Sequence, residues 1–201
     1  LIFPPACGIC GKLGNSYLCE SCKICLNKIE KNVIENYYDK FFTTHFWIFK
    51  YEDEIRDKII DYKFNEKSYL YRTFVEVILN NKKACEYIKS FDYIIPVPIH
   101  KKRYKAIGYN QSELITKDLA KKIENLYFRN DIIKKIKNIV PQSTLNKDER
   151  IYNVKGAFKV LDIDNVKGRR ILLVDDVFTT GSTVNECSKM LLNKGCSEIG
   201  V

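Results

Sequence analysis

The chain has 201 residues, of which 45% are hydrophobic and 29% charged, and its formal net charge at pH 7 is +9. This composition is typical of a globular protein, and the length suits one domain of ordinary size with a small appendage. No apolar run approaches the roughly 20 residues of a membrane span, which argues against a membrane-spanning class, and no secretory signal is visible. The positive charge favours polyanionic partners, although a solvated lysine-rich surface explains it equally well.

Most of the cysteines lie near the start of the chain. Five of the eight fall between Cys7 and Cys25, and four of these form two Cys-x2-Cys pairs. Two such pairs make a tetrahedral thiolate site, the common arrangement for structural zinc. A disulfide-bonded or free-thiol segment is the alternative, and Cys25 could compete as a ligand. We predict a zinc ribbon over residues 1–30, folded by its metal, with the ligands Cys7, Cys10, Cys19 and Cys22.

The segment that follows, residues 26–80, shows three patterns. Residues 26–39 are polar, which indicates a helical linker. Residues 41–51 are rich in aromatic side chains and predict an early strand after a turn. Apolar side chains recur at helical spacing in residues 51–80, and we expect two helices joined near Phe64 and Asn65.

Residues 92–100 predict a buried strand that ends near Ile95, because two prolines follow and proline cannot donate to a sheet. A basic turn comes next, and Gly108 to Gln111 then open a helix. Such a turn suits a pyrophosphate, with a solvated surface turn as the alternative. We expect His100 beside it to be structural rather than catalytic. The candidate pyrophosphate ligands are Lys102, Arg103 and Lys105.

The residues between 128 and 161 predict a strand, a polar segment, a short helix and a second strand. The strands cover Phe128–Lys137 and Ala157–Leu161, and a capping-box pattern starts the helix at Lys147. A polar segment between two β elements is a candidate lid over a site. The lid residues that we single out are Gln142 and Arg150.

A run of four apolar residues, Ile171 to Val174, predicts a strand buried on both faces, and Asp175 and Asp176 follow it. Ligands of open α/β folds sit at the carboxyl ends of such strands. The loop that follows offers backbone N–H groups, hydroxyls and a helix N-terminus, which favour a phosphate, while the acids suit ribose hydroxyls. The acids could instead cap the next helix, residues 183–194. The candidate 5′-phosphate ligands are Thr179, Thr180, Gly181, Ser182 and Thr183.

This last stretch resembles the binding signature for 5-phosphoribosyl diphosphate (PRPP) in type I phosphoribosyltransferases. Taken with the cysteine pairs, the Gly108–Gln111 stretch and the segment from Gln142 to Phe158, the chain resembles the competence protein F (ComF) family over nearly its whole length. Tyr62-Lys63-Phe64 also looks like an element of that family.

The resemblance implies a type I phosphoribosyltransferase fold over residues 31–201: a central parallel sheet flanked by helices, with a small hood. It implies PRPP with Mg²⁺ as ligand, and a role in natural transformation on the cytoplasmic side, with single-stranded DNA and a helicase-like protein as partners. The sequence begins at Leu1 and stops in a strand-like stretch, so we expect its ends to be trimmed. Two departures, Ile107 and Ile139 in place of a common arginine and threonine, weaken the expectation of full catalytic competence.

Three interpretations therefore stand. The first is a ComF-type DNA-uptake factor that binds PRPP or another phosphorylated ligand and need not turn it over. The second is an active phosphoribosyltransferase of base or nucleotide metabolism, in which the catalytic residues Asp175 and Asp176 hold the ribose while pyrophosphate leaves the anomeric carbon. The third is a nucleic-acid adaptor that binds through its zinc ribbon and uses the phosphoribosyl fold as a scaffold. Docking or nucleic-acid binding is the role that we favour for the ribbon.

Overall fold

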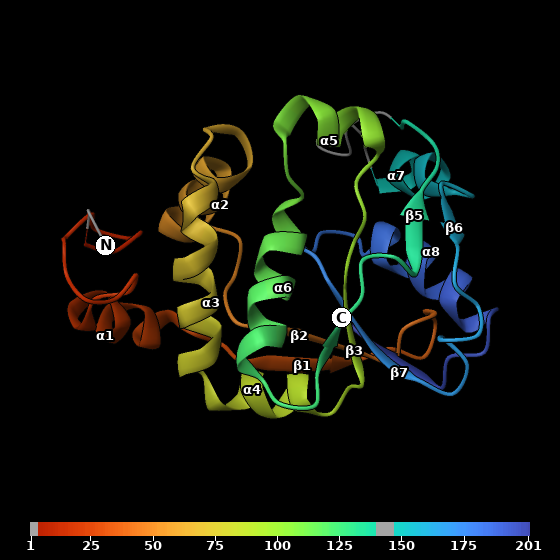
Figure 1. Cartoon of the computed structure of the whole chain (residues 1–201), viewed down its shortest axis with the longest axis horizontal. Coiled ribbons are helices and arrows are strands. Elements are labelled where there is room, and N and C mark those ends of the chain that lie inside the picture. Colours follow the sequence, from red (N-terminus) through yellow and green to blue (C-terminus); the bar gives the residue numbers. More distant parts are fainter. Residues whose placement is uncertain (1–3, 140–146) are drawn as a thin grey trace.

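The computed structural model describes residues 4–139 and 147–201, and a six-stranded sheet forms its centre (Figure 1). The strand order is β1-β2-β8-β7-β3-β4, and every neighbouring pair is parallel except β1 with β2. The predicted fold class, a parallel sheet flanked by helices with a small hood, is confirmed. The strands of this sheet are β1 (Val33–Asn36), β2 (Thr44–Trp47), β3 (Tyr93–Pro96), β4 (Tyr127–Phe128), β7 (Arg170–Val174) and β8 (Glu198–Gly200).

Helices cover both faces of the sheet, as a continuous apolar strand requires. In β7, Ile171 and Leu173 point into one apolar cluster with α8, whereas Leu172 joins a second cluster with α3 and α6. Within the described residues, no helix is long and apolar enough to span a membrane. The helices are α1 (Glu20–Ile29), α2 (Asp53–Phe64), the 3₁₀ turn η1 (Ser68–Leu70), α3 (Tyr71–Asn80), α4 (Lys82–Lys89), α5 (Lys101–Ile107), α6 (Gln111–Lys122), α7 (Lys147–Val154) and α8 (Ser182–Leu192).

The two central strands, β3 and β7, lead the chain in opposite directions across the sheet. The chain leaves β3 through α5 and α6 to reach β4 on one side, and it leaves β7 through α8 to reach β8 on the other. A crevice forms outside the carboxyl ends of parallel strands where the strand order reverses in this way. The fold therefore places a ligand-sized space beside Pro96 and Val174.

A small hood stands over this crevice. It contains a second sheet of β5 (Ile133–Lys135) and antiparallel β6 (Phe158–Val160), together with α7. The prediction of one strand over residues 128–137 is wrong, because β4 belongs to the main sheet and β5 to the hood. Arg129 stabilises the corner between them through ion pairs with Asp131 and Asp162, at 2.8 and 2.6 Å. The helix predicted from Lys147 and the second hood strand are confirmed.

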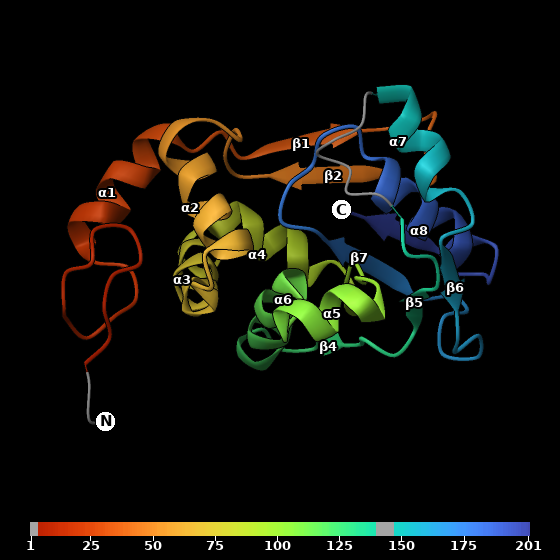
Figure 2. The ribbon, with the colours of Figure 1, turned by 90° about the horizontal axis from the view of Figure 1, so that it is seen from above.

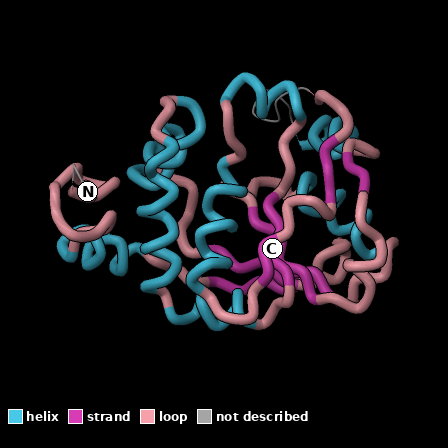
Figure 3. Tube along the Cα trace, viewed as in Figure 1, coloured by secondary structure: helices cyan, strands magenta, loops and turns pink. Residues whose placement is uncertain are grey.

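The N-terminal elements depart from the sequence prediction at one place. Residues 26–39 do not form a helical linker: α1 ends at Ile29, Asn32 turns the chain with φ 53°, and β1 follows as an edge strand (Figure 3). The early strand predicted in residues 41–51 is β2, and the two predicted helices are α2 and α3.

The cysteine-containing segment and α1 lie at the opposite end of the molecule from the hood (Figures 1 and 2). They dock on α3: Leu18 and Leu26 pack against Val77, and the Thr73 hydroxyl donates a 2.9 Å hydrogen bond to the Tyr17 carbonyl. A Cβ atom at Gly8 would collide with the Thr73 hydroxyl, so only glycine allows this close approach. The small apolar core of the segment is therefore shared with α3.

Candidate functional site

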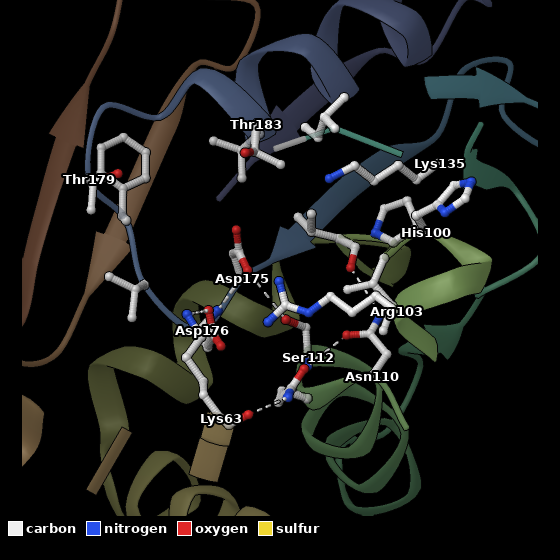
Figure 4. A pocket seen from close by; sticks show the side chains of 18 of the residues that line it. Lys63, His100, Arg103, Asn110, Ser112, Lys135, Asp175, Asp176, Thr179 and Thr183 are labelled. Carbon is white, nitrogen blue, oxygen red and sulfur yellow. Dashed lines mark hydrogen bonds and ion pairs between the residues drawn. The ribbon is translucent and has the colours of Figure 1, made fainter. Parts of the chain in front are cut away.

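A cavity of about 870 Å³ opens where the carboxyl ends of β3 and β7 meet the hood (Figure 4). Asp175 and Asp176 lie on its floor, and the loop after them forms one wall. Helix α5 and strand β5 supply basic side chains on the other side. A space of this size suits a small phosphorylated ligand with room beside it.

The two acids differ in their surroundings. Asp175 accepts hydrogen bonds from the backbone N–H of Asp176 at 3.0 Å and from the Ser112 hydroxyl at 3.5 Å. Burial and the neighbouring charge of Asp176 raise the pKa of Asp175 to about 7. Asp176, with 8% of its side chain exposed, forms a 2.8 Å ion pair with Lys63 from α2. Asp175 can therefore be protonated near neutral pH beside an Asp176 carboxylate that is paired with Lys63, and both groups can form hydrogen bonds to sugar hydroxyls.

The loop after the acids turns into helix α8 through Gly181, whose φ of 69° favours glycine. Of the five predicted phosphate ligands, four line the cavity: Thr179, Gly181, Ser182 and Thr183. Thr180 is not among the lining residues, and its hydroxyl lies 2.6 Å from the Ser182 hydroxyl. Because the first N–H groups of a helix have no intrahelical partner, the start of α8 is suited to an anion.

An aromatic cluster supports this loop on the side of the β1–β2 hairpin, and its central ring, Phe178, also lines the cavity. Phe178 packs edge-to-face on Phe42 and stacks on the His45 ring, with centroids 6.1 and 3.8 Å apart. A Cβ atom at Gly181 would lie 2.6 Å from the Phe178 ring, so the loop closes tightly over it. Burial lowers the pKa of His45, which favours a neutral ring against Phe178. The β1–β2 hairpin thus holds the predicted phosphate loop in place.

The basic residues after β3 form a helix, so the prediction of a basic turn is wrong. His100 caps α5, accepting a 3.3 Å hydrogen bond at Nδ1 from the Lys102 backbone N–H, which fits the structural role expected for it. Lys102 and Arg103 line the cavity, and Arg103 reaches toward the acids (Figure 4). Lys105 is not among the lining residues.

Sequence reasoning missed several side chains that face the cavity. Lys135 extends into it from β5, and burial, with the nearby charge of Arg103, lowers the pKa of Lys135 (Figure 4). The available signal was its position two residues after Ile133 on a short strand, which puts both side chains on the same face, opposite the exposed Lys134. Asn110 and Ser112 come from the start of α6, and Lys63 from the end of α2. Ile107 and Ile139, the two departures from the family pattern, also line the cavity.

The predicted lid residues cannot be placed over the site. Gln142 lies outside the described residues, as does the side chain of Arg150, whose backbone belongs to α7.

The four predicted metal ligands come together at the other end of the molecule. The Sγ atoms of Cys7, Cys10, Cys19 and Cys22 all lie within 4.8 Å of one another, and Cys25 is outside this cluster. The Cys10 and Cys19 sulfur atoms are 3.7 Å apart, close to the ~3.8 Å that tetrahedral zinc with ~2.3 Å Zn–S bonds requires. None of the eight cysteines is disulfide-bonded in the structure, which argues against the disulfide-bonded form of the alternative.

The electrostatics of this cysteine cluster also suit a cation. Burial raises the pKa of the Cys7 thiol, but backbone N–H groups of Cys19, Cys10 and Ile9 outweigh burial and lower it to about 7. Burial and the other three sulfurs raise the pKa of Cys22 well above its ordinary value. Four thiolates this close repel one another unless a dication is bound, so the cluster can hold zinc.

Comparisons with known proteins find one domain family and relatives that align with nearly the whole chain. Residues 110–201 match the phosphoribosyl transferase domain family. The chain is 34% identical to competence protein F of Haemophilus influenzae over 203 aligned residues, which cover 98% of this chain and 82% of that protein. It is 23% identical to competence protein ComFC of Bacillus subtilis, over 94% of this chain and 72% of that protein. DNA utilization protein YhgH of Escherichia coli K12 is 34% identical over 55% of this chain and 47% of its own length.

Proposed function

This chain belongs to the competence protein F family, and from that premise we propose that it binds PRPP, or a related phosphorylated ribose, and acts in DNA uptake. The observation that carries the proposal is the single cavity that joins the two acids, the start of α8 and the basic side chains of α5. Each of these three groups matches one part of PRPP: the ribose, the 5′-phosphate and the pyrophosphate.

The proposed roles follow from the chemistry of each wall. Asp175 and Asp176 accept hydrogen bonds from the 2′- and 3′-hydroxyls of the ribose, and the loop from Thr179 to Thr183 donates to the 5′-phosphate. Lys102 and Arg103 offset the charge of the pyrophosphate, with Lys135 adding a further cation from the hood. Bound Mg²⁺ would offset part of the negative charge of the pyrophosphate, and Asp175 and Asp176 are the carboxylates of the cavity lining that could hold it.

The role in DNA uptake comes from the relatives. Two of them are named competence proteins and one a DNA utilization protein. We propose that this chain acts on the cytoplasmic side of DNA uptake, beside single-stranded DNA and a helicase-like protein. We also propose that residues 1–30 form a zinc-bound docking unit and residues 31–201 the phosphoribosyl unit, because the N-terminal segment with α1 lies at the opposite end of the molecule from the hood (Figure 1).

Turnover is a second candidate, favoured by the room in the cavity of about 870 Å³. In that reaction an acceptor nitrogen forms a bond to the anomeric carbon of PRPP, the bond to pyrophosphate breaks, and the acceptor proton is released. Charge stabilisation of the departing pyrophosphate by Lys102 and Arg103 supplies the catalysis. The apolar side chains of Ile107 and Ile139 add no charge, so the pyrophosphate depends on Lys102, Arg103 and Lys135.

Calorimetric titration with PRPP and Mg²⁺ tests the binding proposal. We expect saturable binding that weakens roughly 100-fold in Asp175→Asn and in Asp176→Asn, because each loses charged hydrogen bonds. Asp57→Asn, an exposed acid on α2, is the matched control and should bind as the wild type does. Equal binding by all variants would overturn the site, and release of pyrophosphate separates turnover from binding.

A genetic test addresses the cellular role. A strain that carries Asp175→Asn should lose transformation while the protein remains at its normal level. Normal transformation in that strain would contradict a role for the ligand site in DNA uptake.

A further inference from the structure

Lys63 lines the cavity, and the proposed function gives it no role. It comes from the end of α2, and its Nζ lies 2.8 Å from the Asp176 Oδ1 (Figure 4). The two side chains are 20% and 8% exposed, so this is not a solvated surface pair. Ion pairs at such burial are sensitive to the loss of one partner, because the other charge is left without compensation.

The backbone around Lys63 is held by a second segment of the chain. The Lys63 carbonyl accepts a hydrogen bond from the Gln111 side chain at 3.5 Å, and the Tyr62 carbonyl accepts one from the Tyr109 hydroxyl at 3.3 Å. In return, the fully buried Tyr62 donates its hydroxyl to the Gln111 carbonyl at 2.7 Å. Two motifs of the sequence, around Tyr62 and around Tyr109, thus meet here and fix where Lys63 points.

We propose that Lys63 is a positioning residue of the ribose site: its ammonium holds the Asp176 carboxylate in the orientation that accepts from a ribose hydroxyl. The inference rests on the proposed function and assigns a task to α2, which lies outside the part of the chain that matches the phosphoribosyl transferase domain. Tyr62, Tyr109 and Gln111 act through Lys63 by clamping its backbone.

The charge of Lys63 has a further consequence for the acids. Asp175 and Asp176 are neighbours in the chain, and two close carboxylates share a proton unless a cation compensates them. Lys63 lowers the pKa of Asp175, against burial and the charge of Asp176, which raise it. Other groups also face the acids, namely Arg103 from α5, Lys135 from β5, Cys187 from α8 and Tyr62 from α2.

The first experiment needs no ligand. The carboxyl groups of Asp175 and Asp176 are titrated by NMR in the wild type, in Lys63→Met, in Lys63→Arg and in Lys67→Met. Lys67 is a matched control, since it forms an ion pair of the same length, 2.8 Å with Asp61, beyond the same end of α2 and outside the cavity. We expect Lys63→Met alone to raise the pH at which the acids titrate. An unchanged titration would overturn the proposal.

The second experiment measures PRPP affinity with Mg²⁺ as a function of pH. Lys63→Met should weaken binding about 10- to 100-fold near neutral pH and move the loss of binding at acid pH to higher pH. Lys63→Arg should recover most of the affinity, and Lys67→Met should match the wild type. Unchanged or tighter binding in Lys63→Met, or an equal loss at every pH, contradicts a positioning role.

The two experiments separate failure of this inference from failure of the proposed function. If the wild type does not bind PRPP, the proposed function is wrong, and the carboxyl titration alone decides whether Lys63 controls the acids. If the wild type binds and Lys63→Met binds equally well, only the inference about Lys63 fails.

Discussion

The cysteine cluster and the acid pocket are built in opposite ways. The ligands of the cluster lie between Cys7 and Cys22 in a single short segment, and their apolar support is one small group of side chains shared with α3. The pocket draws on residues from Tyr51 to Val184, carried by α2, α5, α6, β5, the end of β7 and the start of α8. A local site of this kind depends on its metal for stability, whereas a dispersed site depends on the packing of the whole fold.

The largest effect that we expect is local unfolding of the cysteine-containing segment when its metal site is removed. Structural zinc contributes roughly 10–16 kcal/mol of apparent binding free energy in small zinc modules, and Cys22→Ser removes a buried ligand. We expect Cys22→Ser to lose stoichiometric zinc, measured by atomic absorption, and to expose residues 4–30 to proteolysis. Cys25→Ser, on the same helix but outside the cluster, should keep both properties of the wild type.

The same variant tests whether the two regions are independent. Because the cysteine cluster and the pocket share no ligand or lining residue, we expect PRPP affinity to change less than about threefold in Cys22→Ser. A large loss of affinity would break the comparison and indicate coupling through α3 and α2.

Removal of the aromatic support should damage the pocket and leave the cluster intact. Phe178→Ala deletes a ring that packs on Phe42 and His45 and also lines the cavity, and we expect a loss of about 2–4 kcal/mol in the free energy of unfolding. Urea unfolding measures this loss, and PRPP affinity should fall with it while zinc content stays constant. Tyr38→Ala, which changes a 97% exposed ring in the same hairpin, should have almost no effect. Equal stability of both variants would contradict the support role.

The contributions of the basic residues of α5 to PRPP binding can be measured one residue at a time. Arg103 lines the cavity and Lys105 does not, although both belong to α5. We expect Arg103→Ala to weaken PRPP binding about 10- to 30-fold and Lys105→Ala less than about twofold. Calorimetry on both variants checks the difference, and equal losses would mean that long-range charge rather than contact governs binding.

The smallest expected effect concerns pH. Since burial and Asp176 raise the pKa of Asp175 to about 7, its carboxylate becomes protonated below that pH, and PRPP affinity should fall about tenfold from about pH 8 to about pH 6. Titrations across this range measure the slope. An affinity that is the same at both ends of the range would show that the ionised form is not required.

The free energy of unfolding should change with pH in the opposite direction to PRPP affinity, because the pKa of Asp175 is raised in the folded chain. This pKa lies above its ordinary value of 3.8, so the folded chain holds an extra proton between about pH 4 and about pH 7, and this contribution to stability falls as the pH rises through that window. Asp175→Asn removes the contribution. The difference in unfolding free energy between the variant and the wild type should therefore change only within this window.

Local patterns explain what could be predicted. The spacing of the four cysteines, the apolar run from Ile171 to Val174 and the helical periodicity after Tyr51 each describe a feature formed by neighbours in the chain. The errors fall where local pattern is ambiguous. Polar residues around Asn32 suit a surface helix or an exposed edge strand equally, and the apolar residues on either side of Arg129 read as one strand although a corner divides them.

The sequence by itself therefore determined the chemistry of each site: thiolates at metal-ligand spacing, paired acids after a buried strand, and a hydroxyl-rich loop at the start of a helix. Only the tertiary structure decided that Lys63 and Lys135 face the acids, that Lys105 does not, and that the β1–β2 hairpin supports the loop. The reason is physical. The sequence gives the type of each side chain and its neighbours along the chain directly. Contacts between distant segments instead depend on how the sheet and its two apolar clusters pack.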